Sequence, residues 1–354
     1  MCGGEVLETG GTENRALNMV DIASEFEEIS VRKDIDELTK ETAASLSVFE
    51  KGRTQKEIEL DQSITPDKVL PVDHEFAALY ADVICEGALI AARSKVVFIG
   101  MARQLGGILP LTLSRLSDIS KHFKTTCVVV VENDSTDSTK KILSKFAADN
   151  AKTVVVDSQD FGRPHLRGFE PNRVQAYAEY RNRGRELAQE HFGDADYVIV
   201  VDLDAWGGWS AHGLINGIGW LERIKDAACM ASTSLFQHPG NFIDGKQVWC
   251  HYDQWAFRWH GWKARMEAWF TFWLPPPGAY PIKVLSAFGA AAIYKAEPFF
   301  ACKYESINGD IEHAGLHRNM IAKGWSIYLN PAQRTLMQWS PETSDDDARQ
   351  HGND

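Results

Sequence analysis

Two aspartates, Asp202 and Asp204, follow directly on an apolar run at residues 197–201. Side chains of a strand alternate in direction, so positions i and i+2 point to the same side and both carboxylates are expected to project together where the strand ends. Two ionised carboxylates held that close repel each other, and a divalent cation that bridges them to a phosphate relieves the repulsion. The spacing predicts metal-assisted chemistry on a phosphate; solvated aspartates in a turn are the alternative.

A second apolar run, at residues 128–131, also ends in acids and hydroxyls, with the sequence Glu-Asn-Asp-Ser-Thr-Asp from Glu132 onward. Residues 135–138 supply side chains that can cap a following helix, which explains the hydroxyls without any function. Capping leaves Glu132 and Asp134 unexplained. Ligands of open α/β sheets bind at the carboxyl ends of strands, so two acid-tipped strands predict one shared crevice, with Glu132 and Asp134 binding a base or ribose.

Alternating strand and helix patterns lead up to the aspartate pair. Apolar periodicity predicts helices at 74–92, 111–123, 138–149 and 173–191, and strands at 95–100, 126–131, 153–156 and from 197 onward. This order is typical of a sheet covered by helices on both faces, so we predict an α/β fold. No Gly-x-Gly-x-x-Gly follows any of these strands, which argues against a dehydrogenase-type dinucleotide site. After residue 204 the regular periodicity fades.

Composition and charge narrow the class of protein. The 354 residues are 44% hydrophobic and 24% charged, as in soluble globular proteins, and the net charge of -12 argues against broad contact with nucleic acid. No apolar run reaches the roughly 18 residues of a membrane span, and the N-terminus lacks a signal-peptide core. The six cysteines are scattered without a Cys-x-x-Cys pair, which indicates free thiols in a reducing compartment. We therefore expect a soluble, cytoplasmic protein.

Charged sequence with an approximate helical period occupies the first part of the chain. We expect residues 1–70 to form a helical N-terminal extension that docks on the main domain or on a second subunit. Docking on a second subunit would make the protein a homo-oligomer. Residues 71–340 are expected to form the catalytic domain, and residues 341–354 an acidic, disordered tail.

The two acidic motifs, Glu132-Asn-Asp-Ser-Thr-Asp and Asp202-Leu-Asp, resemble those of the GT-A class of nucleotide-sugar glycosyltransferases. In that class the first motif binds the nucleotide and the second binds metal and diphosphate. Within it, the chain resembles the fungal capsule-associated mannosyltransferases and their bacterial or viral relatives. Supporting segments follow in the same order within residues 95–335: 178–183, Tyr252-Asp253 with Arg258, 286–289 before 298–299, 309–313, Gly324 and 330–331. The resemblance implies a GT-A, Rossmann-like fold, with a mixed sheet flanked by helices.

The same resemblance implies roles for single residues. Nucleotide-sugar contacts are implied for Glu132, Asp134, Arg181, Asn182, Asp202 and Gly289. Metal ligation is implied for Asp202 and Asp204, and catalytic roles for Glu312 and Asp253. The chain departs from the family pattern in two places. The family commonly has a small residue or valine after the acidic pair, whereas here the sequence Ala205-Trp-Gly-Gly-Trp follows, with two tryptophans in the neighbouring loop. The late metal-binding histidine of many GT-A enzymes has no counterpart after Asn330.

His313 and His317 are four residues apart at the start of an expected helix, with Glu312 adjacent. This spacing places both rings on one face of the helix, and His313 is therefore a candidate metal ligand. Histidines near a helix end also cap, pack or stay solvated, which is the alternative. Glu312 would orient an acceptor hydroxyl or balance the positive charge that develops on the sugar as its bond to diphosphate breaks.

Six of the 11 tryptophans lie between residues 249 and 273. Aromatic faces stack on the C–H side of sugar rings, so this segment could hold an acceptor glycan. A local core beneath a long irregular segment is the alternative.

These features predict a glycosyltransferase that uses Mn²⁺ or Mg²⁺ and moves a sugar from a nucleotide sugar to a glycan or lipid-linked glycan, as in polysaccharide biosynthesis. The resemblance implies retaining transfer from GDP-mannose, with a UDP-sugar as the other donor. The enzyme would work in the cytoplasm, or at the periphery of the membrane where the acceptor is made. Two other classes stay open: a phosphatase or phosphotransferase of the haloacid dehalogenase type, whose Asp-x-Asp usually stands near the start of the domain, and a non-catalytic carbohydrate-binding protein.

Overall fold

The structure, a computed structural model, describes residues 65–337 with gaps at 165–170, 244–245 and 264–267. The described residues belong to one compact unit of the chain, Thr54–Asp354. Residues 1–64 of the predicted extension and the predicted tail lie outside the described residues, so both remain predictions. No helix among the described residues is long and apolar enough to cross a membrane.

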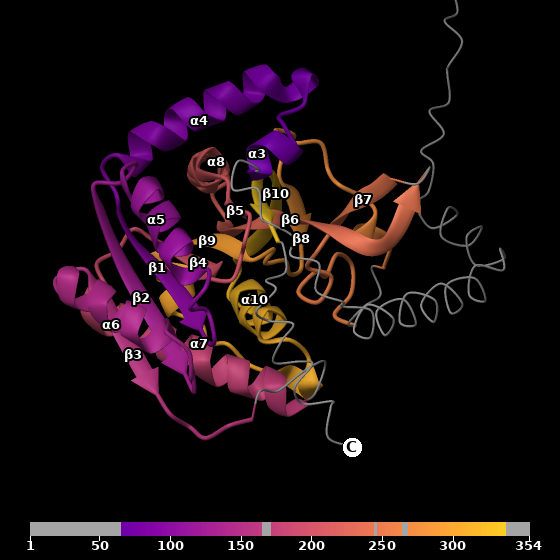
Figure 1. Ribbon diagram of the computed structural model, residues 1–354. Coiled ribbons are helices and arrows are strands. Elements are labelled where there is room, and N and C mark those ends of the chain that lie inside the picture. The colour runs from indigo at the N-terminus through magenta and orange to yellow at the C-terminus, as the bar shows by residue number, and fades with distance from the viewer. Residues whose placement is uncertain (1–64, 165–170, 244–245, 264–267, 338–354) are drawn as a thin grey trace, which may run out of the picture. The chain divides into compact units, whose positions relative to one another are not determined.

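A mixed sheet of ten strands organises the described residues (Figure 1). The strand order is β3-β2-β1-β4-β9-β6-β10-β5, with β7 paired to β6 and β8 to β10. The bounds are β1 Lys95–Ala102, β2 Thr125–Asn133, β3 Val154–Gln159, β4 Tyr197–Asp202, β5 Gly208–Trp209, β6 Ala227–Ile243, β7 Lys246–His251, β8 Ile282–Val284, β9 Ala291–Lys295 and β10 Ser326–Leu336. Strands β1 to β4 run parallel, and β9 pairs antiparallel with both β4 and β6. The predicted mixed α/β sheet is therefore confirmed.

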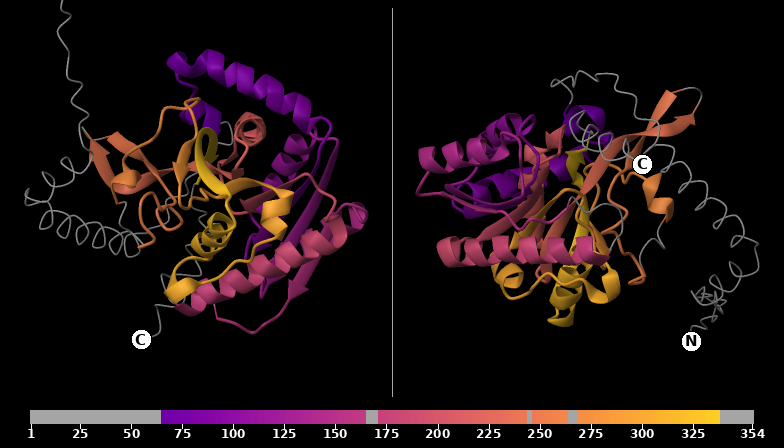
Figure 2. Two further views of the ribbon diagram at one scale, coloured as in Figure 1. Left: turned by 180° about the vertical axis from the view of Figure 1, so that it is seen from behind. Right: turned by 60° about the horizontal axis from the view of Figure 1, so that its bottom comes forward.

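Helices cover both faces of this sheet (Figures 1 and 2). One face carries α4, α5, α6 and α8, and the other carries α7 and α10. The bounds are α4 Ala77–Ala91, α5 Leu109–Ser120, α6 Thr139–Asp149, α7 Pro171–Phe192, α8 Ala211–Arg223 and α10 Glu312–Ala322. Phe98 of β1 belongs to the first core and its neighbour Val97 to the second. This is the period-two alternation of a strand buried on both faces.

Short helical elements complete the described part of the chain. They are α3 Pro66–Val69, η1 His74–Phe76, η2 Ala268–Thr271, α9 Ala296–Phe300 and η3 Ile307–Gly309. Asp67 attaches α3 to the end of β10, because its carboxylate accepts hydrogen bonds from the Arg334 guanidinium at 2.6 Å and from the Ser210 hydroxyl at 2.7 Å. Arg334 is only 1% exposed, so Asp67 provides charge compensation for a buried cation.

The helices and strands predicted between residues 74 and 202 are present, with small shifts at their ends. After residue 204, where the sequence shows no regular alternation of strands and helices, α8 and six further strands follow, and the helix expected at residue 313 is α10. Gly219 of α8 allows a close approach to α4, because a Cβ at this position would lie 2.5 Å from the Val83 carbonyl oxygen. In β6, Ser232 and Thr233 are buried. These hydroxylated residues interrupt the apolar pattern of β6.

Parallel pairing brings the two acid-tipped strand ends together. Met101 of β1 pairs with Val131 of β2 on one side and with Asp202 of β4 on the other. Neighbouring strands are about 4.8 Å apart, so β2 and β4 are separated by roughly 10 Å at this level. Both strand ends therefore meet at one edge of the sheet, as the sequence predicts.

Candidate active site

Asp202 is the last residue of β4, and Asp204 lies in the turn that follows. Leu203 between them is buried, whereas both aspartates are partly exposed, as the alternation of a strand predicts. Thr112 of α5 holds the turn by donating its hydroxyl to the Leu203 carbonyl at 2.9 Å. The fold thus fixes two carboxylates side by side at the edge of the sheet.

These two carboxylates carry negative charge that their protein neighbours only partly compensate. Burial raises the pKa of Asp202 to about 7; the Arg181 guanidinium opposes the shift, and the Asp204 charge adds to it. Burial also raises the pKa of Asp204, against the opposing charges of Arg181 and Arg173. Burial and then the charges of the two aspartates raise the pKa of Tyr252 well above its usual value. A bound cation would relieve this accumulation of negative charge.

Arg181, on α7, joins Asp202 to Glu312. Its Nη2 donates to Asp202 Oδ1 at 3.1 Å and its Nε donates to Glu312 Oε1 at 2.7 Å. The guanidinium carbon lies 4.9 Å from the centre of the Phe288 ring. Burial alone would lower the pKa of Arg181, but the Glu312 and Asp202 charges raise it overall, so the guanidinium stays charged. The structure therefore brings three of the predicted site residues into one ion-paired row.

A buried group of polar atoms surrounds Glu312. Within the described residues, Glu312 Oε2, both ring nitrogens of His313 and the Tyr304 hydroxyl have no hydrogen-bond partner. The His313 ring stacks on Phe288 with 3.8 Å between centroids, and its Nε2 lies 3.6 Å from Glu312 Oε1. Burial and the Arg181 charge lower the pKa of His313 well below its usual value, so its imidazole is neutral. Unpaired buried polar atoms are costly, and an ordered water or a substrate hydroxyl is expected among them.

No three or more His, Cys, Asp or Glu side chains of the described residues form a group that could hold a metal ion. Asp202 and Asp204 nevertheless fit a divalent cation, because Mg²⁺ is commonly held by one or two carboxylates with phosphate oxygens and water completing its shell. The raised pKa of both carboxylates supports this fit. The structure does not bring His313 into a metal-binding group with them. Both ring nitrogens of His317 lie near neighbouring hydroxyls, at 2.9 and 3.0 Å.

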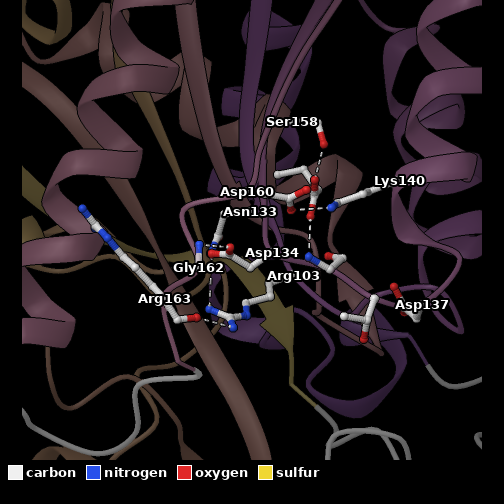
Figure 3. A network of polar contacts seen from close by, with 12 residues as sticks. Arg103, Asn133, Asp134, Asp137, Lys140, Ser158, Asp160, Gly162 and Arg163 are labelled. Atoms are coloured by element: carbon white, nitrogen blue, oxygen red, sulfur yellow. Dashed lines mark hydrogen bonds and ion pairs between the residues drawn. The ribbon is translucent and has the colours of Figure 1, made fainter.

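Glu132, at the end of β2, is fully buried. Its Oε1 accepts the Ser135 N–H at 2.9 Å, and its Oε2 accepts the hydroxyl of Ser158, which lies at the top of the network in Figure 3. These contacts tie the loop after β2 to β3. They favour a role for Glu132 in shaping that loop over a direct contact with a nucleotide.

Asp134 follows Glu132 in the same loop and has a left-handed backbone, with φ 52°. Its carboxylate accepts the Asn133 amide at 3.1 Å and the Gly162 N–H at 2.7 Å, and the Arg103 guanidinium lies 4.0 Å away (Figure 3). Burial would raise the pKa of Asp134, but these donors and the Arg103 charge lower it overall. An ionised carboxylate and a guanidinium therefore lie side by side in the loops that follow β1 and β2.

The loop after β1 is hydrogen-bonded to the loop after β2. Gln104, with φ 54°, accepts the Thr136 N–H at 2.6 Å. The Asp137 carboxylate accepts the Gly106 N–H at 2.7 Å and the Thr139 N–H, the first of α6, at 3.0 Å. Ser138, the N-cap residue of α6, makes no cap bond with its side chain; Asp137 instead accepts the first N–H of the helix and fixes the two loops to each other.

Asn182 connects α7 to the segment that precedes α10. Its amide nitrogen donates to the Tyr304 carbonyl at 2.8 Å, and its Oδ1 accepts the Tyr304 N–H at 3.0 Å. Both ends of the side chain are therefore engaged by the protein. Its predicted nucleotide contact stays a prediction, and the observed pairing favours a structural role.

Asp253 and Gly289 are connected to Asp202 through backbone hydrogen bonds. The Asp253 carboxylate accepts the Gly289 N–H at 2.8 Å and a further backbone N–H at 3.1 Å. Gly289 has φ 67°, and a Cβ there would lie 1.9 Å from the Ser232 carbonyl oxygen, so the position requires glycine. Ala290, also left-handed with φ 61°, accepts the Asp202 N–H at 2.9 Å. These contacts favour positioning roles for both predicted residues.

Arg258 is fully buried and connects two segments of the chain. It donates to the Trp255 carbonyl at 2.7 Å and to the Asp310 carboxylate at 2.5 Å. The segment after Asp253 is thereby held against the segment that precedes Glu312.

Three site residues were missed from the sequence: Arg103, Arg173 and Phe288. Arg103 directly follows an apolar strand, which was the available signal. Arg173 lies in the first turn of α7 and lowers the pKa of Asp204 against the effect of burial. Phe288 supports the Arg181 guanidinium and the His313 ring; it lies in the segment 286–289 that supports the resemblance, but no role was predicted for it.

Two open hollows flank α7. The first has a volume of about 560 Å³ and is lined by Val131, Asp157, Gln159, Phe161, Glu179, Tyr180, Asn182, Arg183 and Glu186. The second, of about 320 Å³, is lined by Gln175, Ala178, Glu179, Asn182, Tyr304, Glu305, Ser306 and Ile307. Neither lining includes the aspartate pair. The first hollow adjoins the Asp134 loop, because Phe161 directly precedes the Gly162 N–H that Asp134 accepts.

No protein-family model and no curated protein matches this chain. Among solved structures it is similar to S. aureus TarS 1-349, with 12% identity, a TM-score of 0.40, and 69% of this chain and 60% of that chain covered. It is similar to the mannosyltransferase PcManGT from Pyrobaculum calidifontis in complex with GDP-Man and Mn²⁺, with 13% identity and a TM-score of 0.41. That match covers 75% of this chain and 69% of that chain. It is also similar to GalNAc-T7 with UDP, GalNAc and Mn²⁺, with 12% identity and a TM-score of 0.43; the match covers 78% of this chain and 54% of that chain.

The chain therefore spans less than two thirds of the length of two of these three structures. Identities of 12 to 13% are too low to transfer a substrate or a residue role, so we argue function from the side chains of this chain. Membership of the capsule-associated mannosyltransferases stays a prediction.

Proposed function

We propose that this chain is a nucleotide-sugar-dependent glycosyltransferase in which Asp202 and Asp204 hold Mn²⁺ or Mg²⁺ against the donor diphosphate. The observation that carries the proposal is the partly compensated charge of the two aspartates at the edge where β1, β2 and β4 end. Two carboxylates with raised pKa values favour a divalent cation, and phosphate oxygens complete the shell of such a cation. When bound, the metal would neutralise the diphosphate that leaves the sugar.

The nucleoside end of the donor would lie toward β2 and β3. Asp134 is ionised and can accept hydrogen bonds from a base or ribose, and Arg103 beside it can pair with a phosphate. Phe161 and Tyr180, with ring centroids 5.5 Å apart, give the adjoining 560 Å³ hollow an aromatic wall on which a base can stack. This arrangement distributes nucleoside and diphosphate along one edge of the sheet.

At the reaction centre, Arg181 is the protein cation that contacts Asp202. A fixed guanidinium there can stabilise the charge that develops on the departing diphosphate, and it needs no reorganisation because Glu312 and Phe288 already hold it. Glu312 is 1% exposed, so it acts through Arg181 as a positioning residue unless a substrate hydroxyl reaches its free Oε2. The acceptor would be a glycan or a lipid-linked glycan.

The haloacid dehalogenase alternative is less well supported. Its Asp-x-Asp stands near the start of the domain, whereas Asp202 ends the fourth described strand, after β1, β2 and β3 of the same sheet. A non-catalytic sugar-binding protein would not need two acid-tipped strands with a buried Arg181–Glu312 pair between the sheet and α10.

The test is a screen of the purified protein against GDP-mannose, UDP-glucose, UDP-GlcNAc and UDP-galactose, each with Mn²⁺ and with EDTA. A ligand that binds only the folded state raises the melting temperature, by an amount that grows with its concentration relative to Kd. We expect one nucleotide sugar to raise Tm only when metal is present. We also expect that sugar donor to be hydrolysed slowly, with release of its nucleoside diphosphate. Hydrolysis of p-nitrophenyl phosphate without any nucleotide-sugar response would overturn the proposal in favour of a phosphatase.

A further inference from the structure

An exposed aromatic surface lies in the segment that follows Asp253. Trp259, Trp269, Phe272 and Trp273 are exposed to 37, 42, 57 and 39% of their area. We call these four residues the aromatic platform. Large aromatic side chains gathered at a surface mark a binding site more often than single exposed ones do.

The platform is held in place by a buried aromatic layer. The rings of Phe257 and Phe270 stack face to face at 3.5 Å, and both are buried. Trp269 packs edge-on against each of them, at 6.3 and 6.1 Å. The Trp269 ring also lies 5.2 Å from Trp259 and 5.6 Å from Trp273. Three tryptophans are therefore fixed in a row before any ligand arrives, which lowers the entropy cost of binding.

The segment that carries the platform begins at the proposed reaction centre. Arg173, whose charge acts on Asp204, lies with its guanidinium 5.3 Å from the Trp255 ring. Arg258 holds the Trp255 carbonyl and, on its other side, the Asp310 carboxylate shortly before Glu312. The segment that leads to the platform is thus tied at Trp255 and Arg258 to residues beside Asp204 and Glu312.

The shape and charge of the molecule favour a glycan over a lipid surface. Neighbouring rings in the tryptophan row are inclined by 56° and 53°, which suits a polymer whose successive sugar rings turn relative to each other, whereas a bilayer presents a flat boundary. The net charge of -12 opposes approach to anionic lipid. Sugar rings present an apolar C–H face to an aromatic ring while their hydroxyls stay hydrated, so half-exposed tryptophans are suitable partners.

We propose that the aromatic platform binds the acceptor glycan chain, by stacking its sugar rings on Trp259, Trp269 and Trp273 at a distance from the bond that forms. This inference rests on the proposed function, since it takes the Asp204 and Glu312 region as the place where the growing end of the glycan lies. Binding energy obtained at the platform would lower the KM for long acceptors and leave donor binding unchanged.

The experiment titrates the full-length protein, without donor, with four soluble hexasaccharides: mannohexaose, cellohexaose, xylohexaose and chitohexaose. Tryptophan fluorescence gives the binding curve. We expect at least one hexasaccharide to bind, and Trp269→Ala and Trp273→Ala each to weaken it by about tenfold, since one aromatic contact contributes about that factor. Trp273→Phe should retain most of the affinity. Tyr280→Ala, which removes a 63% exposed ring outside the platform, is the matched control and should bind as the wild type does.

Donor binding, measured separately with nucleotide sugars and Mn²⁺, distinguishes the two proposals. If a hexasaccharide binds through the tryptophans but no nucleotide sugar binds, the proposed function fails and the platform stands as a sugar-binding surface. If a nucleotide sugar binds but no hexasaccharide does, the platform proposal is overturned. It is also overturned if Trp269→Ala leaves hexasaccharide affinity intact, or if Trp269 is needed only for binding to phosphatidylcholine–phosphatidylglycerol vesicles.

Discussion

Arg181 Nε donates to Glu312 Oε1 at 2.7 Å, and this contact joins the long helix α7 to the first residue of α10. Both side chains are almost fully buried, and the same guanidinium reaches Asp202 at 3.1 Å. Breaking a buried ion pair by removing one partner leaves an uncompensated charge in a low-dielectric environment. The pair therefore links the stability of the α7–α10 contact to the position of a cation beside Asp202.

Replacing either partner should reveal this link. Arg181→Met leaves the Glu312 carboxylate buried without its cation and should cost about 3–5 kcal/mol of stability, whereas Glu312→Gln keeps a hydrogen-bond acceptor and should cost less. The variant that carries both Arg181→Met and Glu312→Gln should lose less free energy of unfolding than the sum of the two single losses, because the interaction between the two residues is removed only once. Urea denaturation of the four proteins measures this coupling.

Kinetics of the same Glu312→Gln variant test the role of the pair in transfer. Donor affinity should change little, and kcat should fall about 10²-fold, the loss expected when a group that stabilises transition-state charge is misplaced. Calorimetry of donor binding beside steady-state rates provides the comparison. A variant with normal kcat would mean that Glu312 serves stability alone.

Asp202 and Asp204 should be required for metal binding. Without metal, their mutual repulsion should destabilise the folded protein. Asp204→Asn removes one of two repelling charges, so the metal-free variant should melt at a higher temperature than the wild type at pH 8. It should also lose the rise in Tm that Mn²⁺ gives the wild type, along with transfer activity. Asp118→Asn, which changes an exposed carboxylate on α5, is the control. Full Mn²⁺ response in Asp204→Asn would contradict the metal assignment.

The pH dependence of metal-free stability has a defined sign. The pKa of Asp202 is raised from 3.8 in the unfolded chain to about 7 in the folded protein, so between these values the folded state binds more protons than the unfolded one. Stability from this group therefore declines as pH rises from about 4 to about 7 and does not recover above it. We expect metal-free Tm to fall across that range, and the Mn²⁺-dependent increase to appear as pH passes about 7. Asp204→Asn should reduce the slope only in part, because burial is the larger cause of the raised Asp202 pKa.

The parallel half of the fold could be predicted from the sequence because its strands are buried on both faces and its helices are amphipathic. Valine-rich runs such as residues 128–131 allow little else, and a parallel sheet brings their carboxyl ends to one edge. The placement of Asp202 and Asp204 on one side followed from strand alternation. Strand β6 of the second half was harder to predict, because its buried Ser232 and Thr233 carry no apolar signal.

Side-chain partners in the site could not be predicted either. Glu132 and Asp134 stand two residues apart after one strand, yet the first is fully buried against Ser158 and the second pairs with donors at the crevice. A left-handed φ at Asp134 separates their directions, and the sequence does not specify that angle. The Arg181–Glu312 pair spans 131 positions, and no local pattern encodes such a contact.

Asp253 should act through Gly289 and Ala290 rather than on the substrate. Asp253→Asn replaces one of two accepting oxygens by an N–H₂ group that faces a backbone N–H, so we expect a loss of about 1–3 kcal/mol. Gly289→Ala should be at least as destabilising, because its Cβ meets the Ser232 carbonyl. Both variants should weaken the Mn²⁺ response only partly, as their effect on Asp202 is indirect. Complete loss of transfer in a well-folded Asp253→Asn protein would indicate a direct catalytic role.

The boundary of the N-terminal extension can be tested at Asp67. We expect deletion of residues 1–64 to change sedimentation, if that region mediates self-association, and to leave turnover per active site near normal. A deletion that continues through residue 70 also removes Asp67 and the Leu70 carbonyl, both of which accept hydrogen bonds from the buried Arg334 guanidinium. An unsatisfied buried donor costs about 1–3 kcal/mol, so the longer deletion should unfold at lower urea. Asp67→Asn in the full-length chain should reproduce part of that loss without changing sedimentation. Equal stability of the two deletions would show that Asp67 does not anchor α3 to β10.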